Sequence, residues 1–260
     1  MAIDLFSIGS FTIHGYGLMI GLGFLISVLW AAAEAKKAGL SADHITSIAL
    51  WTLVIGVLGG KLLFIIVEFK TFISAPLSVL GSSGFVVYGG IITGVLTIIG
   101  YCLIKKISVG DYIDMIASFV PLNQAFGRVG CFLAGCCYGR ETDAWYGVIF
   151  PEGCLAPAGV KLVPTQLIMA AGDLAIFIIL YVLRTKKILS GGRLAAAFLT
   201  MYSVGRFAVE FLRNDYRGSI GFLSTSQFIA LWIFAIGVIF LVISGRKHKT
   251  PVNVEEDFFR

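Results

Sequence analysis

The sequence predicts an all-α, polytopic membrane protein with seven transmembrane helices. Of its 260 residues, 58% are hydrophobic and 13% are charged, against roughly 25% charged residues in soluble globular proteins. Glycine occurs 31 times, as is common in membrane helices, where it lets neighbouring helices approach closely. The third observation is a series of seven apolar segments, each near the length of about 20 residues that spans a bilayer.

The predicted spans follow one another through mostly short connections, and each is recognised by an apolar run of sufficient length. Their ranges are 11–33, 46–68, 84–104, 111–134, 166–183, 194–212 and 224–244. The third span is rich in glycine, so a re-entrant segment there, leaving six spans, is the alternative. The longest connection, 135–165, is expected to be an ordered surface loop. We predict a single transmembrane domain, 1–250, and a short cytoplasmic tail, 251–260.

Basic residues are distributed unevenly between the two ends of the spans. Lysine and arginine gather in alternate connections, at 36–37, 105–106 and 184–193, and again from 246 onward. Because basic residues favour the cytoplasmic side, the N-terminus is predicted outside and the C-terminus in the cytoplasm. Residues 1–10 lack the basic start of a signal peptide, so the first span is expected to remain. The clusters do not form a basic stripe, and we expect no nucleic-acid binding.

Three basic residues lie inside predicted spans, where a charge at mid-helix costs roughly 2.5–3.5 kcal/mol. They are Lys61, Arg128 and Arg206. Both arginines lie late in spans that run outward, so their guanidinium groups should reach the same depth near the outer face. Guanidinium binds phosphate through two parallel hydrogen bonds, and the pair therefore predicts a clamp for a phospholipid head group. The alternative is that each arginine reaches the interface or pairs with Glu210 or Asp215.

Three residues of this region, Glu210, Lys61 and His14, can each be interpreted in two ways. Glu210 shares a helical face with Arg206 at i, i+4 spacing, so it is either a structural ion-pair partner or a catalytic carboxylate. Lys61 is either a third cation of the site or a lysine that reaches the interface through its flexible chain. His14 opens the first span near the outer face, where it is either a base of suitable pKa or an interfacial residue without a chemical role.

Six motifs occur in order along the chain. They are HGYGLMIG at 14–21, GGK at 59–61, YGGIITG at 88–94, GRVGCFLAGCCYG at 127–139, PTQL at 164–167 and GRFAVEFLRND at 205–215. Together they resemble the bacterial prolipoprotein diacylglyceryl transferases over about residues 10–245. The block that begins at Gly127 is the most specific part of the resemblance.

This resemblance implies a bacterial cell-membrane enzyme that moves the diacylglyceryl group of phosphatidylglycerol onto the lipobox cysteine of a prolipoprotein signal peptide. Glycerol phosphate leaves, the cavity is open to membrane lipid, and we expect no cofactor and a monomer. The resemblance implies that Arg128 and Arg206 hold the phosphate and that Tyr16, Gly89 and Gly90 line the cavity. Taking the residue patterns into account as well, we predict Arg128, Arg206, Tyr88 and His14 as catalytic residues. The predicted substrate-binding residues are Tyr16, Lys61, Gly89, Gly90, Gly127, Gly139 and Glu210.

The chain departs from the family pattern at several polar positions. Members often carry histidine where Tyr88 stands, and a phenol with a reference pKa near 10 is a poor base at neutral pH. Asparagine and glutamate of the signature block are replaced by Cys131 and Cys136, and a histidine before PTQL by Val163. A lipid-binding paralogue without catalysis, or one with another acceptor, is therefore the alternative. A transporter would show two related halves with buried acids, and the sequence does not show this pattern. Asp173 is a lone acid in the fifth span, and we assign it no role.

Cysteine is concentrated at the end of the fourth span. Cys131, Cys136 and Cys137 lie within seven residues, and Cys154 follows in the long connection. Their spacing does not match the paired ligands of a zinc site, so we expect no metal. A disulfide of Cys136 or Cys137 with Cys154, small packing residues at a tight helix end and a catalytic thiol all stay open.

Overall fold

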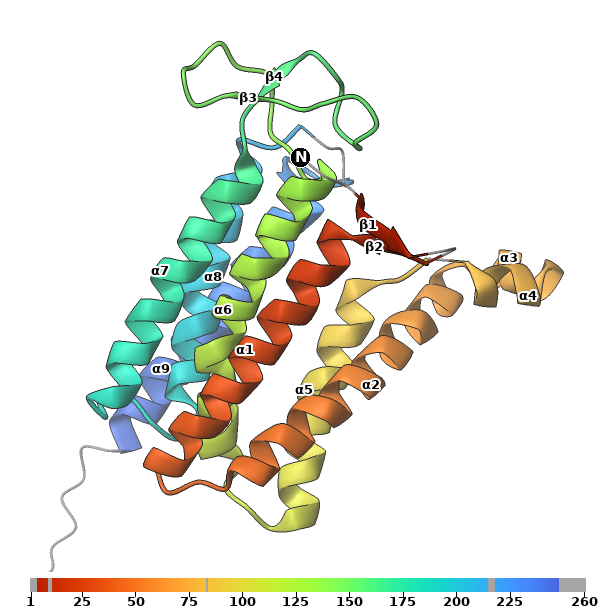
Figure 1. The fold of residues 1–260 in the computed structure, drawn as a ribbon. Coiled ribbons are helices and arrows are strands. Elements are labelled where there is room, and N and C mark those ends of the chain that lie inside the picture. The colour runs from red at the N-terminus through yellow and green to blue at the C-terminus, as the bar shows by residue number, and fades with distance from the viewer. Residues whose placement is uncertain (1–3, 9–10, 83, 215–217, 248–260) are drawn as a thin grey trace, which may run out of the picture. The chain divides into compact units, whose positions relative to one another are not determined.

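The computed structural model describes residues 4–8, 11–82, 84–214 and 218–247 (Figure 1). The long helices are α1 (Gly15–Lys37), α2 (Ala42–Val67), α5 (Val87–Lys105), α6 (Val109–Ala134), α7 (Thr165–Thr185), α8 (Arg193–Glu210) and α9 (Thr225–Lys247). The short helices are α3 (Phe69–Ser74) and α4 (Pro76–Gly81). Three antiparallel pairs of strands complete the described elements: β1 (Asp4–Ile8) with β2 (Phe11–His14), β3 (Val148–Ile149) with β4 (Lys161–Leu162), and β5 (Ser219–Ile220) with β6 (Leu223–Ser224).

Each long helix coincides with one predicted span to within a few residues. In the described part of the chain, α1, α2, α5, α7 and Thr225–Ser244 of α9 are long and apolar enough to cross a membrane. The other two long helices, α6 and α8, are less apolar and carry the two candidate arginines. The chain is therefore an all-α, multi-pass membrane protein with five spans supported by composition, and the count of seven stays a prediction. The glycine-rich third segment is one continuous helix of 19 residues, α5.

The structure corrects the sequence prediction at the start of the first span and adds detail to two connections. Residues 11–14 form strand β2 instead of the first turn of a helix, because β1 offers them a partner and β-branched residues suit a strand. Helices α3 and α4 occupy a connection for which we predicted no structure. The loop 135–165 is ordered, as expected: Phe150 and Leu162 are buried against Phe132 of α6. The predicted tail, 251–260, lies outside the described residues.

The chain divides into two compact units, Met1–Ser27 with Ala117–Arg260, and Val28–Ile116. In the first unit α8 packs against both α7 and α9 (Figure 1). Leu180, Leu194 and Phe198 form a buried apolar cluster there. In the second unit α2 packs along α5 (Figure 1). We refer to these as the polar-helix unit and the glycine-packed unit.

Candidate active site

Arg128 of α6 lies among polar groups from three helices of the polar-helix unit. Its half-buried guanidinium is within electrostatic range of Asp173 on α7 and Tyr202 on α8. Asp173 is only 3% exposed, and its Oδ2 atom accepts no hydrogen bond. Asp173 is thus a buried acid within electrostatic range of Arg128, and its Oδ2 atom is not held by another group of the protein.

Other buried polar atoms occur on α6 and α7. The side-chain oxygens Oδ1 of Asn123, Oε1 of Gln124 and Oε1 of Gln166 have no hydrogen-bond partner within the protein. Gln124 precedes Arg128 by one helical turn and so shares its face of α6. Because an unpaired buried polar group costs about 1–3 kcal/mol, these atoms favour an interior that receives water or a polar ligand.

Arg206 of α8 is held by two neighbours. Its Nη1 atom lies 2.7 Å from Oε2 of Glu210, in an ion pair whose side chains are 12% and 9% exposed. The two atoms are not aligned for a hydrogen bond, whereas Nη2 donates to Oγ of Ser226 on α9 at 2.8 Å. The ion pair expected from the i, i+4 spacing is thus confirmed. The other proposed partner, Asp215, lies outside the described residues.

An apolar groove runs between α8 and α9 close to Arg206. Its volume is about 260 Å³. It is lined by Ser203, Val204, Phe207, Ala208, Ala230, Leu231 and Phe234. Arg206 directly precedes the lining residue Phe207 and donates a hydrogen bond to Ser226 of α9, so one cation lies near a surface that could hold an acyl chain.

Tyr16 at the start of α1 lies against α6. A Cβ atom on Gly130 would come within 3.1 Å of the Tyr16 carbonyl oxygen, so glycine at this position permits the close approach of the two helices. The Tyr16 hydroxyl is within electrostatic range of Arg128 and of Cys131, Cys136 and Cys137. His14, two residues earlier, is exposed at the end of β2 and pairs with Asp4 in the strand register.

The two glycines of the signature block have different surroundings. A Cβ atom on Gly127 would meet nothing within 4 Å, so this position is open. A Cβ atom on Gly139 would lie 2.6 Å from the carbonyl oxygen of Leu212, and the Gly139 amide donates to Val163 at 2.9 Å. Gly139 therefore allows close backbone packing, and this geometry favours a structural role over substrate contact.

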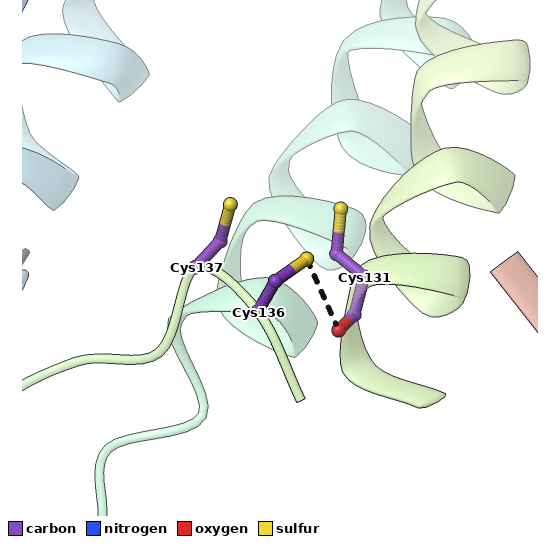
Figure 2. Close-up of side chains that lie close together, drawn as sticks. All are labelled: Cys131, Cys136 and Cys137. Carbon is purple, nitrogen blue, oxygen red and sulfur yellow. Dashed lines mark hydrogen bonds between the residues drawn. The ribbon is translucent and has the colours of Figure 1, made fainter. Parts of the chain in front are cut away.

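Three thiols gather where α6 ends (Figure 2). The sulfur atoms of Cys131, Cys136 and Cys137 all lie within 4.8 Å of one another. The helix closes with Gly135 in the left-handed region at φ +70°, and the Cys136 amide donates back to the Cys131 carbonyl at 3.1 Å. In this type of helix end, the residue after the left-handed glycine contacts a residue in the last turn of the helix. Here these two residues are Cys136 and Cys131. Cys137, at φ +64°, adds the third thiol.

The start of α7 fixes this turn. Thr165 donates from Oγ1 to the Cys137 carbonyl at 2.6 Å, and Gln166 donates from Nε2 to the Cys136 carbonyl at 2.7 Å. Both side chains are fully buried. Hydrogen bonds from the two other thiols, together with the Arg213 guanidinium, lower the pKa of the Cys137 thiol. All five cysteines are thiols, and Cys154 donates to the Pro151 carbonyl instead of bridging to the cluster.

Lys61 belongs to the glycine-packed unit and is surrounded by backbone carbonyls. Its Nζ atom donates to the carbonyls of Val79 at 2.8 Å, Ser82 at 2.7 Å and Gly84 at 3.4 Å. It also lies over the ring of Phe64, 5.1 Å from the centroid. This arrangement stabilises the end of α4 and the loop that follows, and it disfavours the predicted role in substrate binding.

The predicted site residues at the start of α5 also have packing roles. A Cβ atom on Gly89 would collide with the Gly59 carbonyl oxygen of α2, and one on Gly90 would lie 3.0 Å from that of Gly56. These glycines allow α2 and α5 to pack at short distance. Tyr88 precedes them and is 46% exposed, so its ring is accessible from outside the glycine-packed unit.

Comparison with known proteins assigns a family. The family model described as prolipoprotein diacylglyceryl transferase matches residues 4–243. The chain is 44% identical to a phosphatidylglycerol–prolipoprotein diacylglyceryl transferase of Clostridium tetani over 238 residues, covering 90% of this chain and 94% of that protein. A second such enzyme, numbered 2, of Clostridium perfringens is 42% identical over 253 residues, covering 96% and 98%. The chain belongs to the prolipoprotein diacylglyceryl transferase family. The resemblance seen in its motifs is thereby confirmed.

Sequence reasoning missed several residues of this family member's polar interior. Asp173 and Tyr202 face Arg128, and Thr165 and Gln166 fix the thiol turn. Asp173 carried a usable signal, since an acid inside an apolar span is costly without a partner. Tyr202 lies four residues before Arg206 on α8, and its sequence position alone does not identify the helix that it faces.

Proposed function

We propose that this protein transfers the diacylglyceryl group of phosphatidylglycerol to the lipobox cysteine of prolipoproteins and releases glycerol phosphate. The observation that carries the proposal is the family match over residues 4–243, together with 44% identity to an enzyme named for this activity. The same proposal orients the chain with its N-terminus outside, where both substrates are available, and its C-terminus in the cytoplasm.

Arg128 is the residue to which we assign the lipid phosphate. It carries a permanent charge, it lies in a partly buried polar interior, and its nearby acid leaves one oxygen without a partner. A guanidinium can replace a weak contact with Asp173 by a bidentate contact with phosphate, because its planar donors match that geometry. Gln124, on the same face of α6, is available for the glycerol hydroxyls of the head group.

Arg206 is assigned a second contact at the edge of the apolar groove. Its charge is already balanced by Glu210 at 2.7 Å, so we expect it to contribute less to phosphate binding than Arg128. The pair orients Arg206 beside a surface of about 260 Å³ that suits an acyl chain. We propose that α8 and α9 receive one hydrocarbon chain while α6 and α7 receive the head group.

The reaction needs a thiolate nucleophile and stabilisation of the leaving group. The lipobox sulfur attacks the glyceryl carbon that carries the phosphate ester, a C–S bond forms, and the C–O bond breaks with its electron pair on the departing glycerol phosphate. The thiol proton is released to a base or to water. Negative charge grows on the phosphate ester oxygen as the bond breaks, and a preorganised arginine stabilises that charge.

A transfer assay tests the proposal. Purified protein is mixed with phosphatidylglycerol and a lipobox peptide, and the peptide mass is followed. We expect the peptide to gain one diacylglyceryl group, whereas a matched peptide with serine in place of the cysteine gains none. Lipid binding without any transfer would instead support a non-catalytic lipid-binding member of the family. Unchanged transfer with the serine peptide would show that the acceptor is not the thiol.

A further inference from the structure

The three thiols at the end of α6 form a group that the proposed transfer reaction does not require. The nucleophile of that reaction comes from the substrate, so the enzyme needs no cysteine of its own. Three sulfur atoms within 4.8 Å of one another nevertheless lie at one helix end (Figure 2). Two buried side chains, Thr165 and Gln166, are hydrogen-bonded to the carbonyls of this turn.

The distances suit one thiophilic metal ion. Zinc binds thiolate sulfur at about 2.3 Å in tetrahedral geometry, which places two ligating sulfurs about 3.8 Å apart. The observed separations of at most 4.8 Å need to shrink by about 1 Å or less. A change of this size is on the scale of side-chain rotation, and the Cys136 thiol now points at the Cys131 carbonyl 3.6 Å away.

The surroundings suit the charge of such a site. Three thiolates around a divalent ion carry one net negative charge, which needs a cation nearby in a partly buried place. Arg213 donates a hydrogen bond to Cys137, and Arg128 is within electrostatic range of Cys131 and Cys137. Cys131 is buried while Cys136 and Cys137 are half-buried, so one side of the cluster remains accessible.

We propose that Cys131, Cys136 and Cys137 bind one zinc ion, and that its open fourth position binds the thiol of the incoming lipobox cysteine. This inference rests on the proposed function for its second half. Catalytic zinc sites have three protein ligands and one position for substrate, and a thiol that binds the ion loses its proton outright. The site thus supplies the thiolate that the reaction needs. In this chain Tyr88 replaces a histidine that could otherwise act as the base, so another means of forming the thiolate is required.

The chemistry balances without any redox step. The substrate thiol releases its proton to water on binding zinc. Its sulfur then attacks the glyceryl carbon next to the phosphate ester, and the C–O electron pair leaves with glycerol phosphate. The thioether product binds zinc more weakly than the thiolate does, because it is neutral, and the position becomes open again.

Metal content and X-ray absorption of the full-length protein test the site. The protein is purified in detergent with a non-thiol reductant and loaded with Zn²⁺. We expect about one zinc per chain, bound by three sulfurs at about 2.3 Å, in the unchanged protein and in Cys154→Ala. We expect loss of that zinc in the double variant C136S/C137S, with transfer reduced roughly 10²-fold. Equal zinc in all three proteins, no sulfur around the metal, or a disulfide within the cluster would overturn the proposal.

Addition of peptide to the unchanged protein tests the fourth position, independently of whether the variants fold. A lipobox peptide with cysteine should raise the number of sulfurs around zinc from three to four, and the serine peptide should not. No added sulfur would overturn the role of the metal in thiol activation. Transfer by protein that binds no zinc would sink this inference and leave the proposed function standing. Zinc bound through three sulfurs in a protein that never transfers would sink the proposed function and leave only the metal site.

Discussion

The two units of this protein use similar sequence features for different purposes. In the glycine-packed unit, Gly59, Gly89 and Gly90 allow α2 and α5 to pack closely. The Lys61 ammonium there donates to several backbone carbonyls. In the polar-helix unit, Arg128 has only a partial counter-ion and several buried oxygens lack partners. A cation inside a span is therefore a candidate for chemistry only when the groups around it leave it unsaturated.

The largest expected effect is the loss of transfer in Arg128→Ala. Removal of one preorganised donor to a developing anion costs about 10²–10³-fold in rate, and the lipid phosphate would also bind more weakly. Arg128→Lys should recover part of the rate, since it restores charge without the bidentate geometry. The assay is diacylglyceryl transfer to a lipobox peptide, with thermal unfolding as the control for folding. Full activity of Arg128→Ala would remove this residue from the site.

Gly89→Val tests the packing role of the glycine-packed unit. The added side chain would collide with the Gly59 carbonyl, and overpacking of this kind costs about 1–3 kcal/mol or more. Gly100→Val is the matched control, because it lies on the same helix and a Cβ atom there meets nothing within 4 Å. We expect a clear drop in melting temperature for Gly89→Val alone. Equal melting temperatures for the two variants would contradict the close approach of α2 and α5.

Asp173→Asn sharpens the account of Arg128. The variant removes the buried carboxylate near the guanidinium, and an uncompensated charge in a partly buried place lowers stability. We expect a melting temperature several degrees below that of the unchanged protein in neutral detergent. Added phosphatidylglycerol should raise it by more than it raises the unchanged protein, because the lipid phosphate then supplies the missing charge. An equal response of both proteins to the lipid would separate Asp173 from the anion site.

Lys61→Met is expected to have the smallest effect on chemistry. It removes the donor to the carbonyls of Val79, Ser82 and Gly84, so the melting temperature should fall modestly. Transfer per folded molecule should not change. Lys70→Met, at an exposed position on α3, controls for the loss of one positive charge. A fall in transfer with an unchanged melting temperature would return Lys61 to the substrate site.

Much of the fold follows from hydropathy, because the bilayer requires long apolar helices and leaves few alternatives. The strand at Phe11–His14 escaped prediction because it depends on pairing with β1. The carbonyl contacts of Lys61 could not be predicted, because every residue type offers a backbone carbonyl and its acceptors lie 18–23 residues away in the sequence. Glu210 was correctly paired with Arg206, since both lie on one helix and spacing alone decides the contact.

The proximity of the three thiols could not be predicted from the spacing of the cysteines in the sequence. The positions 131, 136 and 137 do not match familiar zinc motifs, yet two left-handed residues at the helix end bring the three sulfurs together. Gly135 could be recognised as a helix terminator from sequence, but the left-handed conformation of Cys137 could not. Asp173 was similarly visible as an isolated acid, while its proximity to Arg128 became evident only when α6 and α7 were packed together.

A structure of the protein with bound phosphatidylglycerol, determined by electron cryo-microscopy, would show directly which cation holds the lipid phosphate. We predict that the lipid phosphate lies within hydrogen-bond distance of the Arg128 guanidinium, while the Lys61 ammonium keeps its contacts with the carbonyls of Val79 and Ser82. A phosphate bound at Lys61, with Arg128 still beside Asp173 and no lipid near it, would contradict the account.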